Sequence, residues 1–229
     1  MKTFLIILLF CSVANGLTLS DIRTEARLLS SDYQGTRQRY TDAQITNWIN
    51  EGQRLADVFA LCNYQMTSFD LAAGSTYYNL PTDYIMTRRV TSDLQVLPER
   101  SPASLDSRSA EWESQTGEPT YYFTKFSSRA SIGFVPVPAV VGDTTTINVE
   151  YIGYSDVLSS DSDVPFDSIV EFTGFHHILS YFAAYKMNLI DGRVEIAGMF
   201  LQQYNTFLKE MQMKCVERPN YLPGLQPQK

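Results

Sequence analysis

The stretch T-D-A-Q-I-T-N-W-I-N-E-G-Q-R-L-A, residues 41–56, is the strongest structural signal in this sequence. Thr41 and Gln44 have the spacing of a helix capping box, in which each side chain accepts from the other residue's backbone N–H. An apolar stripe at helical spacing follows the cap. It consists of Ile45, Trp48, Ile49, Gly52, Leu55, Phe59 and Cys62. The pattern predicts a helix over 41–62 whose striped face lies in the core.

Two further strings lie downstream of this helix. In Y-N-L-P-T-D-Y, residues 78–84, the Leu80-Pro81 step ends a strand, because proline has no N–H to donate to a sheet. In T-G-E-P-T-Y-Y-F, residues 116–123, we expect Gly117 and Pro119 to form a turn whose φ angles suit only such residues. An aromatic strand follows this turn.

The segment between 64 and 154 has the two-residue period of strands. The clearest alternation lies near its end, where Ile147, Val149 and Tyr151 oppose Asn148, Glu150 and Ile152. A short helix is expected over 101–113, with Ser101 as its cap. The whole segment is predicted to be an antiparallel β-rich insertion.

Helical periodicity flanks this insertion on both sides. Besides 41–62, it predicts helices over 18–30, 168–190 and 193–214, and the last two form a hairpin across Asp191-Gly192. The sequence therefore predicts an α+β fold in which four α-helices, two N-terminal and two C-terminal, pack together around a β-rich insertion.

The composition excludes one broad class of function. The chain has 229 residues, 25 of them acidic and 18 basic, for a formal net charge of −7. A surface that binds nucleic acid by neutralising phosphates is basic, so this chain is not expected to wrap DNA or RNA.

Few residues have the chemistry of an active site. His176 and His177 are the only histidines, and neighbours on a helix point about 100° apart, so they cannot chelate one ion together. One is expected to pack and the other to face solvent. A histidine-dependent triad or zinc hydrolase is therefore not expected.

The remaining polar residues of these segments are predicted to be ordinary surface positions. Asp161 and Asp163 lie in a Ser-rich loop that lacks the glycine and terminal glutamate of a calcium loop. Asn50, Glu51 and Gln53 are expected to face solvent. We predict no catalytic, metal or cofactor site, and no enzymatic activity.

The cysteines leave two states open. Cys62 and Cys215 have no metal-ligand or redox spacing. Two reduced thiols are the expectation for a chain that assembles inside a cell. A single disulfide between them is the expectation if the chain is exported.

Residues 1–16 conflict with a cytoplasmic protein. They combine Lys2, an apolar run and the small residues Ala14 and Gly16 at a cleavage position, as secretory signals do. Three interpretations stay open: an over-extended gene start with the true first residue at position 17, a genuine signal, or a retained extension.

The three strings, in this order and followed by D-V-P at 163–165 and F-H-H-I-L at 175–179, resemble the tailed-bacteriophage head-to-tail connector family, the portal adaptors. The similarity covers Leu19 to about Met211. The resemblance implies structural roles for the positions that carry it. They are Trp48, Asn50, Glu51, Leu80, Pro81, Gly117 and Pro119.

The resemblance also implies a division of the chain and a function. Residues 17–215 would form the adaptor domain, and 216–229 a tail that docks on the portal or a neighbour. Its docking residues would be Tyr221, Leu222, Pro223 and Leu225. The adaptor would be a virion protein that forms a ring of about twelve copies on the portal.

In such a ring the expected partners are further copies of the chain, the portal protein and the next tail or neck component. Double-stranded DNA would pass through the channel without sequence-specific binding, and no membrane is involved. The alternative is an exported, envelope-associated α+β binding protein, cleaved near Gly16 and carrying the Cys62–Cys215 disulfide.

Overall fold

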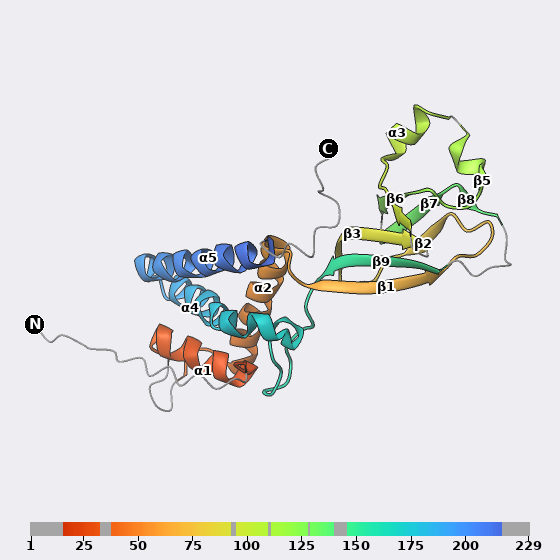
Figure 1. The fold of residues 1–229 in the computed structure, drawn as a ribbon. Helices are drawn as coiled ribbons and strands as arrows, with labels where there is room; N and C mark the ends of the chain where they lie inside the picture. The colour runs from red at the N-terminus through yellow and green to blue at the C-terminus, as the bar shows by residue number, and fades with distance from the viewer. Residues whose placement is uncertain are drawn as a thin grey trace, which may run out of the picture. The chain divides into compact units, whose positions relative to one another are not determined.

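The computed structural model describes residues 16–32, 38–92, 95–109, 111–127, 129–139 and 146–216 (Figure 1). It has the predicted α+β fold. The chain divides into two compact units, one formed by Met1–Leu55 with Asp156–Lys214 and the other by Ala56–Ser155 with Cys215–Lys229. We call them the helical unit and the β-rich unit.

Four α-helices dominate the helical unit. They are α1 (Leu19–Ser30), α2 (Asp42–Ala60), α4 (Ile178–Ile190) and α5 (Val194–Val216). Thr18 caps α1 through a capping box with Asp21. Thr41 and Gln44 form the expected box at the start of α2, with Gln44 N 3.2 Å from Thr41 Oγ1.

Close contacts join these helices. A Cβ on Gly52 of α2 would come within 2.9 Å of the Phe182 ring on α4, so only glycine fits there. The Tyr204 hydroxyl on α5 donates to the Gly52 carbonyl across 2.8 Å. Helices α4 and α5 lie side by side as a hairpin (Figure 1).

Two predicted helices have different bounds in the structure. The helix expected from 168 begins only at Ile178, after the 3₁₀ turns η2 (Phe166–Ser168) and η3 (Val170–Phe175). Ile169, inside the predicted range, has ψ of 115°, an extended conformation that interrupts an α-helix, and Phe166 and Asp167 just before it have φ of 56° and 53°. Leu61 has φ of 54°, so α2 ends at Ala60 and Cys62 lies outside it.

The β-rich unit contains nine strands among the described residues, arranged in three sheets. The first sheet has the order β1-β9-β3-β4, the second β2-β7-β6 and the third β5-β8. The strands are β1 (Tyr64–Asp70), β2 (Tyr77–Asn79), β3 (Tyr84–Ser92), β4 (Gln95–Leu97), β5 (Thr116–Gly117), β6 (Tyr121–Phe126), β7 (Ala130–Val135), β8 (Val137–Pro138) and β9 (Thr146–Gly153). All pairs are antiparallel except β5 with β8.

The alternation of β9 faces a core as expected. Ile147 and Val149 are fully buried and Tyr151 nearly so. They pack with Leu80, Val90, Leu97, Tyr122, Ile132 and Phe134. A second cluster joins Leu105, Trp112, Phe123 and Val135.

The helix expected over 101–113 is two short elements. Ser101 caps α3 (Pro102–Asp106), and the 3₁₀ turn η1 covers Trp112–Ser114. The two elements are tied by a hydrogen bond of 2.7 Å from Trp112 Nε1 to Asp106 Oδ1.

Candidate functional site

Two polar residues of the central string bind a distant loop instead of facing solvent. Asn50 Nδ2 donates to the Leu158 carbonyl, and the Leu158 N–H donates to Asn50 Oδ1, both across 2.9 Å. Gln53 is 1% exposed. Its Nε2 donates to the Asp156 carbonyl at 2.8 Å, and its Oε1 accepts from the Phe166 N–H at 3.1 Å. The expectation that Asn50 and Gln53 face solvent is therefore wrong.

A signal for Gln53 was present in the sequence. It lies four residues after Ile49 and three before Ala56, both fully buried, so helical geometry places it on the apolar stripe. A polar side chain there needs hydrogen-bond partners. The periodicity could not say that the partners lie in residues 156–166.

The other two residues of this string have simpler surroundings. Trp48 is half-buried and packs edge-on against Tyr40, with ring centroids 5.3 Å apart. Glu51 is exposed and pairs with Lys186 of α4 across 2.6 Å. The outward position expected for Glu51 is confirmed, although its charge is partnered.

The loop that Asn50 and Gln53 hold also closes the start of α1. The Leu19 N–H donates to the Asp163 carbonyl at 2.8 Å, and the Ser20 N–H donates to the Asp161 carbonyl at 3.2 Å. The Asp163 carboxylate accepts from the N–H groups of Ser159 and Ser160, which lowers its pKa. The loop is thus fixed by backbone bonds and is not simply solvated.

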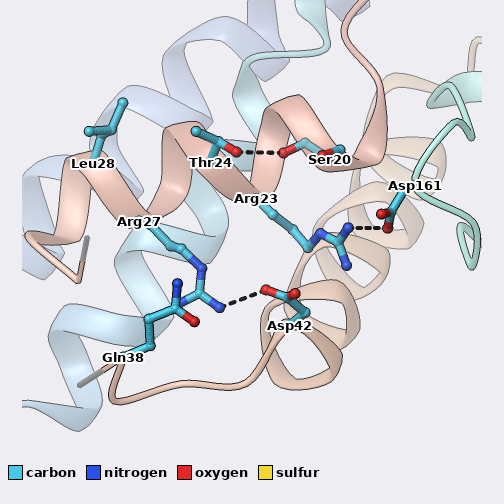
Figure 2. A pocket seen from close by; sticks show the side chains of 8 residues that line it. All are labelled: Ser20, Arg23, Thr24, Arg27, Leu28, Gln38, Asp42 and Asp161. Atoms are coloured by element: carbon cyan, nitrogen blue, oxygen red, sulfur yellow. Dashed lines mark hydrogen bonds and ion pairs between the residues drawn. The ribbon is translucent and has the colours of Figure 1, made fainter. Parts of the chain in front are cut away.

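A pocket of about 360 Å³ lies beside this junction (Figure 2). It is lined by Ser20, Arg23, Thr24, Arg27, Leu28, Gln38, Asp42 and Asp161. Figure 2 shows Arg23 and Arg27 extending from α1 toward Asp161 and Asp42. Arg23 pairs with Asp161, and Arg27 pairs with Asp42 at 2.7 Å and with Asp32 at 2.6 Å.

These ion pairs leave little net charge in the pocket, because the guanidinium groups of Arg23 and Arg27 each pair with a carboxylate. The Arg27 hydrogen bond lowers the pKa of Asp42. Arg27 and Asp32 are both buried, so removing one partner would leave an uncompensated charge. The arrangement joins α1, the start of α2 and the acidic loop, and it is suited to structure rather than catalysis.

A second polar cluster fixes the hairpin turn. The Tyr40 hydroxyl donates to Asp191 Oδ1 at 2.7 Å, and Arg39 and Arg193 both pair with the same carboxylate. Burial and the Asp191 charge raise the pKa of Tyr40 to about 12. Burial alone would raise the pKa of Asp191, but its bonds from Tyr40 and Arg193 and the charge of Arg39 lower it.

One histidine packs in the core as expected, but the other does not face solvent as predicted. His176 is fully buried; its Nδ1 lies 3.3 Å from the Leu17 carbonyl, and its Nε2 has no hydrogen-bond partner among the described residues. Burial lowers the pKa of His176 to about 4. His177 does not face solvent freely: it is half-buried against Tyr181 and Phe207, and burial lowers its pKa too.

Cys62 and Cys215 form a disulfide, with Cα atoms 5.7 Å apart. Both side chains are buried. The expectation of two reduced thiols is therefore wrong, and the alternative left open from the sequence, one disulfide across 153 positions, is the state in the structure.

The residues of the strings 78–84 and 116–123 that carry the family resemblance lie in turns and at strand ends of the β-rich unit. Leu80 is fully buried, and the Tyr84 N–H donates to the Pro81 carbonyl at 3.2 Å, which closes the turn. Pro119 is buried. Gly117 pairs with Pro138 as part of β5 and has no positive φ, so its expected turn role is wrong.

The described residues bring no three potential metal ligands together, and none of their helices is long and apolar enough to cross a membrane. Tyr221, Leu222, Pro223 and Leu225 lie outside the described residues. What the geometry does present is a helical unit whose string residues hold a loop in place, which is an architectural arrangement.

The model of the SU10 adaptor protein family matches residues 17–223. The chain belongs to this family. It is a family of phage head–tail adaptors, so this adaptor is a structural component of the virion. A search of curated proteins found no match.

The family match extends beyond the similarity expected from the strings, which ended near Met211. It takes in Tyr221, Leu222 and Pro223 of the tail but not Leu225, and it begins after residue 16. All the string positions from Trp48 to Pro119 fall inside it.

Proposed function

We propose that the adaptor forms a closed ring of about twelve copies on the portal of a tailed phage. The ring joins the head to the next tail or neck component, extends the DNA channel and helps to retain the packaged genome. The observation that carries this proposal is the family match over residues 17–223.

The proposed mechanism is positional and non-enzymatic. Double-stranded DNA passes through the ring without sequence-specific binding, and the excess of 25 acidic over 18 basic residues disfavours adhesion of phosphates to the wall. The bonds from Asn50 and Gln53 to the 156–166 loop support a rigid helical unit, which a ring that joins head to tail needs.

The string residues have architectural roles in this proposal, and the tail docks the ring. Trp48, Asn50, Glu51, Leu80, Pro81, Gly117 and Pro119 hold the shape of the protomer. The tail, through Tyr221, Leu222, Pro223 and Leu225, binds the portal or a neighbouring copy. Removing 216–229 is expected to abolish portal binding; unchanged binding would rule this part out.

Electron microscopy of the purified protein, alone and mixed with its portal, tests the ring. Rings of about twelvefold symmetry stacked on the portal are the expected result. A monomer that ignores the portal would overturn the proposal. An exposed-face substitution such as Gln203→Ala serves as a matched control for protein quality.

One observation favours a second candidate, an exported envelope-associated binding protein. Disulfides persist in oxidising compartments, and Cys62 is bonded to Cys215. Alkylation of the denatured, unreduced protein from infected cells and from released particles separates the two. Oxidised thiols in the cell envelope, with a mature chain that starts after Gly16, favour export; reduced thiols during assembly in the cytoplasm oppose it.

A further inference from the structure

The last turn of α2 exposes two apolar side chains. Phe59 belongs to the stripe that was predicted to face the core, yet it is 59% exposed, and Val58 beside it is 40% exposed. The expectation that Phe59 lies in the core is therefore wrong. We call Val58 and Phe59 the apolar patch.

Asp57 fixes which side of this turn faces inward. Its carboxylate accepts from the Ser155 N–H at 2.8 Å and from the Ser155 hydroxyl at 2.9 Å. Asp57 and Ala60 are each only 2% exposed. Successive positions on a helix point about 100° apart, so burial of Asp57 and Ala60 directs the two residues between them outward. The patch is thus a fixed feature of the helix end.

The C-terminal segment of the chain starts close to this patch. The disulfide places the Cα atoms of Cys62 and Cys215 5.7 Å apart. Phe59 is three residues before Cys62, so its Cα lies within about 17 Å of that of Cys215, given about 3.8 Å between successive Cα atoms. Phe59, Cys62 and Cys215 all belong to the β-rich unit.

The length of chain beyond the described residues is sufficient to reach the patch. The structure describes the chain as far as residue 216, so 217–229 follow. Six extended residues span about 20 Å, so Tyr221 can reach Phe59 from Cys215. A tether this short gives a local concentration on the order of millimolar, at which even a weak contact forms.

The composition of this segment fits an apolar partner. Residues 219–228, P-N-Y-L-P-G-L-Q-P-Q, contain no charged side chain. Tyr221, Leu222 and Leu225 offer aromatic and aliphatic surface, whose removal from water is favourable. The prolines restrict the free segment, so docking costs less conformational entropy, and proline-containing segments commonly bind aromatic side chains.

We propose that, before the adaptor meets the portal, the segment 217–229 of each copy docks on the apolar patch of the same copy. Tyr221 and Leu222 pack against Phe59 in this arrangement. In the proposed function the same two residues bind the portal or a neighbour, so the patch holds them until that partner competes. The contact lies within one chain and does not depend on ring formation.

Photochemical cross-linking of the full chain tests the contact. Phe59 is replaced by p-benzoylphenylalanine, which keeps an aromatic side chain at this exposed position, and the protein is irradiated without portal. Mass spectrometry of the digested protein identifies the peptides that are joined. Cross-links from position 59 to peptides of 217–229 are expected in about tenfold excess over the control, because the tether concentrates the segment there.

The control places the same photoreactive residue at Phe126, another exposed phenylalanine of the β-rich unit. The Phe126 ring lies 6.3 Å from that of Tyr84, and Tyr84 pairs with Gly153, whose N–H donates to the Asn63 carbonyl. Phe126 is therefore at the same end of the sheet as Cys62. Equal cross-linking at positions 59 and 126, or none at 59, would overturn the docking.

Isotope labelling separates the same copy from a neighbouring one. Equal amounts of unlabelled and ¹⁵N-labelled protein are mixed before irradiation. Cross-linked peptides of a single isotope composition are expected. Pairs that join a labelled to an unlabelled peptide would overturn docking within one chain.

Hydrogen exchange covers the case in which the photoreactive residue disturbs the fold. Amides of Tyr221, Leu222 and Leu225 in the unsubstituted protein are expected to exchange about fivefold more slowly than in Phe59→Ser. Equal exchange rates in the two proteins would overturn the contact.

Addition of the portal distinguishes this inference from the proposed function. Cross-links from position 59 should fall as the portal binds. Cross-links that persist on portal-bound rings would overturn portal docking by the tail and leave the patch contact standing. Rings on the portal from a protein that gave no cross-links alone would overturn the patch contact and leave the proposed function standing.

Discussion

The helical unit and the strands of the β-rich unit bury different kinds of side chain, and the other buried polar residues of the β-rich unit, Asp57, Asn63 and Ser155, lie outside its strands. Among the described strands of the β-rich unit, Ser92 is the only buried polar residue, and the core is otherwise apolar and aromatic. The described part of the helical unit buries charged and polar groups among its apolar residues. They are Arg27, Ser30, Asp32, Gln53, His176, Ser180 and Asn188.

The difference shows two ways of specifying a fold. Apolar burial is non-directional, so a strand core tolerates many sequences of similar volume. A buried polar side chain is costly unless a particular partner meets it, so each one selects a particular arrangement. In the helical unit, Asn50 and Gln53 select the position of the 156–166 loop.

The largest effect is expected in the apolar core. Phe134 is fully buried and packs against Tyr78, with ring centroids 5.6 Å apart. Phe134→Ala should lower the free energy of unfolding by about 4 kcal/mol, because it removes transfer energy and leaves a cavity. Urea unfolding followed by circular dichroism measures this. Phe126→Ala, at a position 71% exposed, is the control and should change little.

An equal loss in the two phenylalanine variants would mean that the strand core is not the main source of stability in that unit. The claim that apolar burial specifies the strands of the β-rich unit would then be wrong.

The next effect depends on pH and belongs to the helical unit. The folded pKa of His176 is about 4 against an ordinary value of 6.5. Between these values the unfolded chain binds the extra proton, so stability is fully present above pH 6.5 and is lost as pH falls to 4. A shift of this size corresponds to about 3 kcal/mol.

The measurement is the free energy of unfolding at pH 7 and at pH 4, for the natural chain and for His176→Gln. The natural chain should lose about 3 kcal/mol more than the variant across this interval. Carboxylates titrate in both proteins, so the difference isolates His176. Identical losses would show that this buried ring does not titrate in the fold.

Local patterns predict the strand cores of the β-rich unit better than they predict the polar partners in the helical unit. The burial of Ile147 and Val149 was predictable, because alternation within one strand decides which side chains face the core. Helix starts at Thr18 and Thr41 were predictable, since capping partners lie three residues away. The order of strands in the sheets was not, because hydrogen bonding between strands leaves no local pattern.

The candidate site was harder to predict for a physical reason. Asn50 meets Leu158 across 108 sequence positions, and nothing near Asn50 reveals that partner. The extended conformation of Ile169, which interrupts the helix expected from 168, was equally hidden, because isoleucine also occurs inside helices. The family resemblance predicted the family, which the match over residues 17–223 confirms, but it predicted neither of these two features.

A smaller effect tests the directional bonds of the helical unit. Gln53→Leu preserves volume but leaves the Asp156 carbonyl and the Phe166 N–H without their partner. The free energy of unfolding should fall by about 2 kcal/mol. Gln203→Leu, at an exposed position on α5, should change it by less than about 0.5 kcal/mol. If Gln53→Leu were neutral or stabilising, apolar burial would account for both units, and the contrast between them would fail.

The smallest effect comes from the first turn of α1. Thr18 Oγ1 accepts from the Asp21 N–H at 3.3 Å, and Asp21 Oδ2 accepts from the Thr18 N–H at 3.0 Å. Thr18→Ala should cost about 1 kcal/mol in urea unfolding, because it breaks one side of the capping box. Thr206→Ala, inside α5 where alanine is the better helix former, should cost nothing. The Leu19 and Ser20 N–H groups stay bonded to the 161–163 loop in this variant, so a loss much above 1 kcal/mol would mean that the cap and the loop act as one cooperative unit.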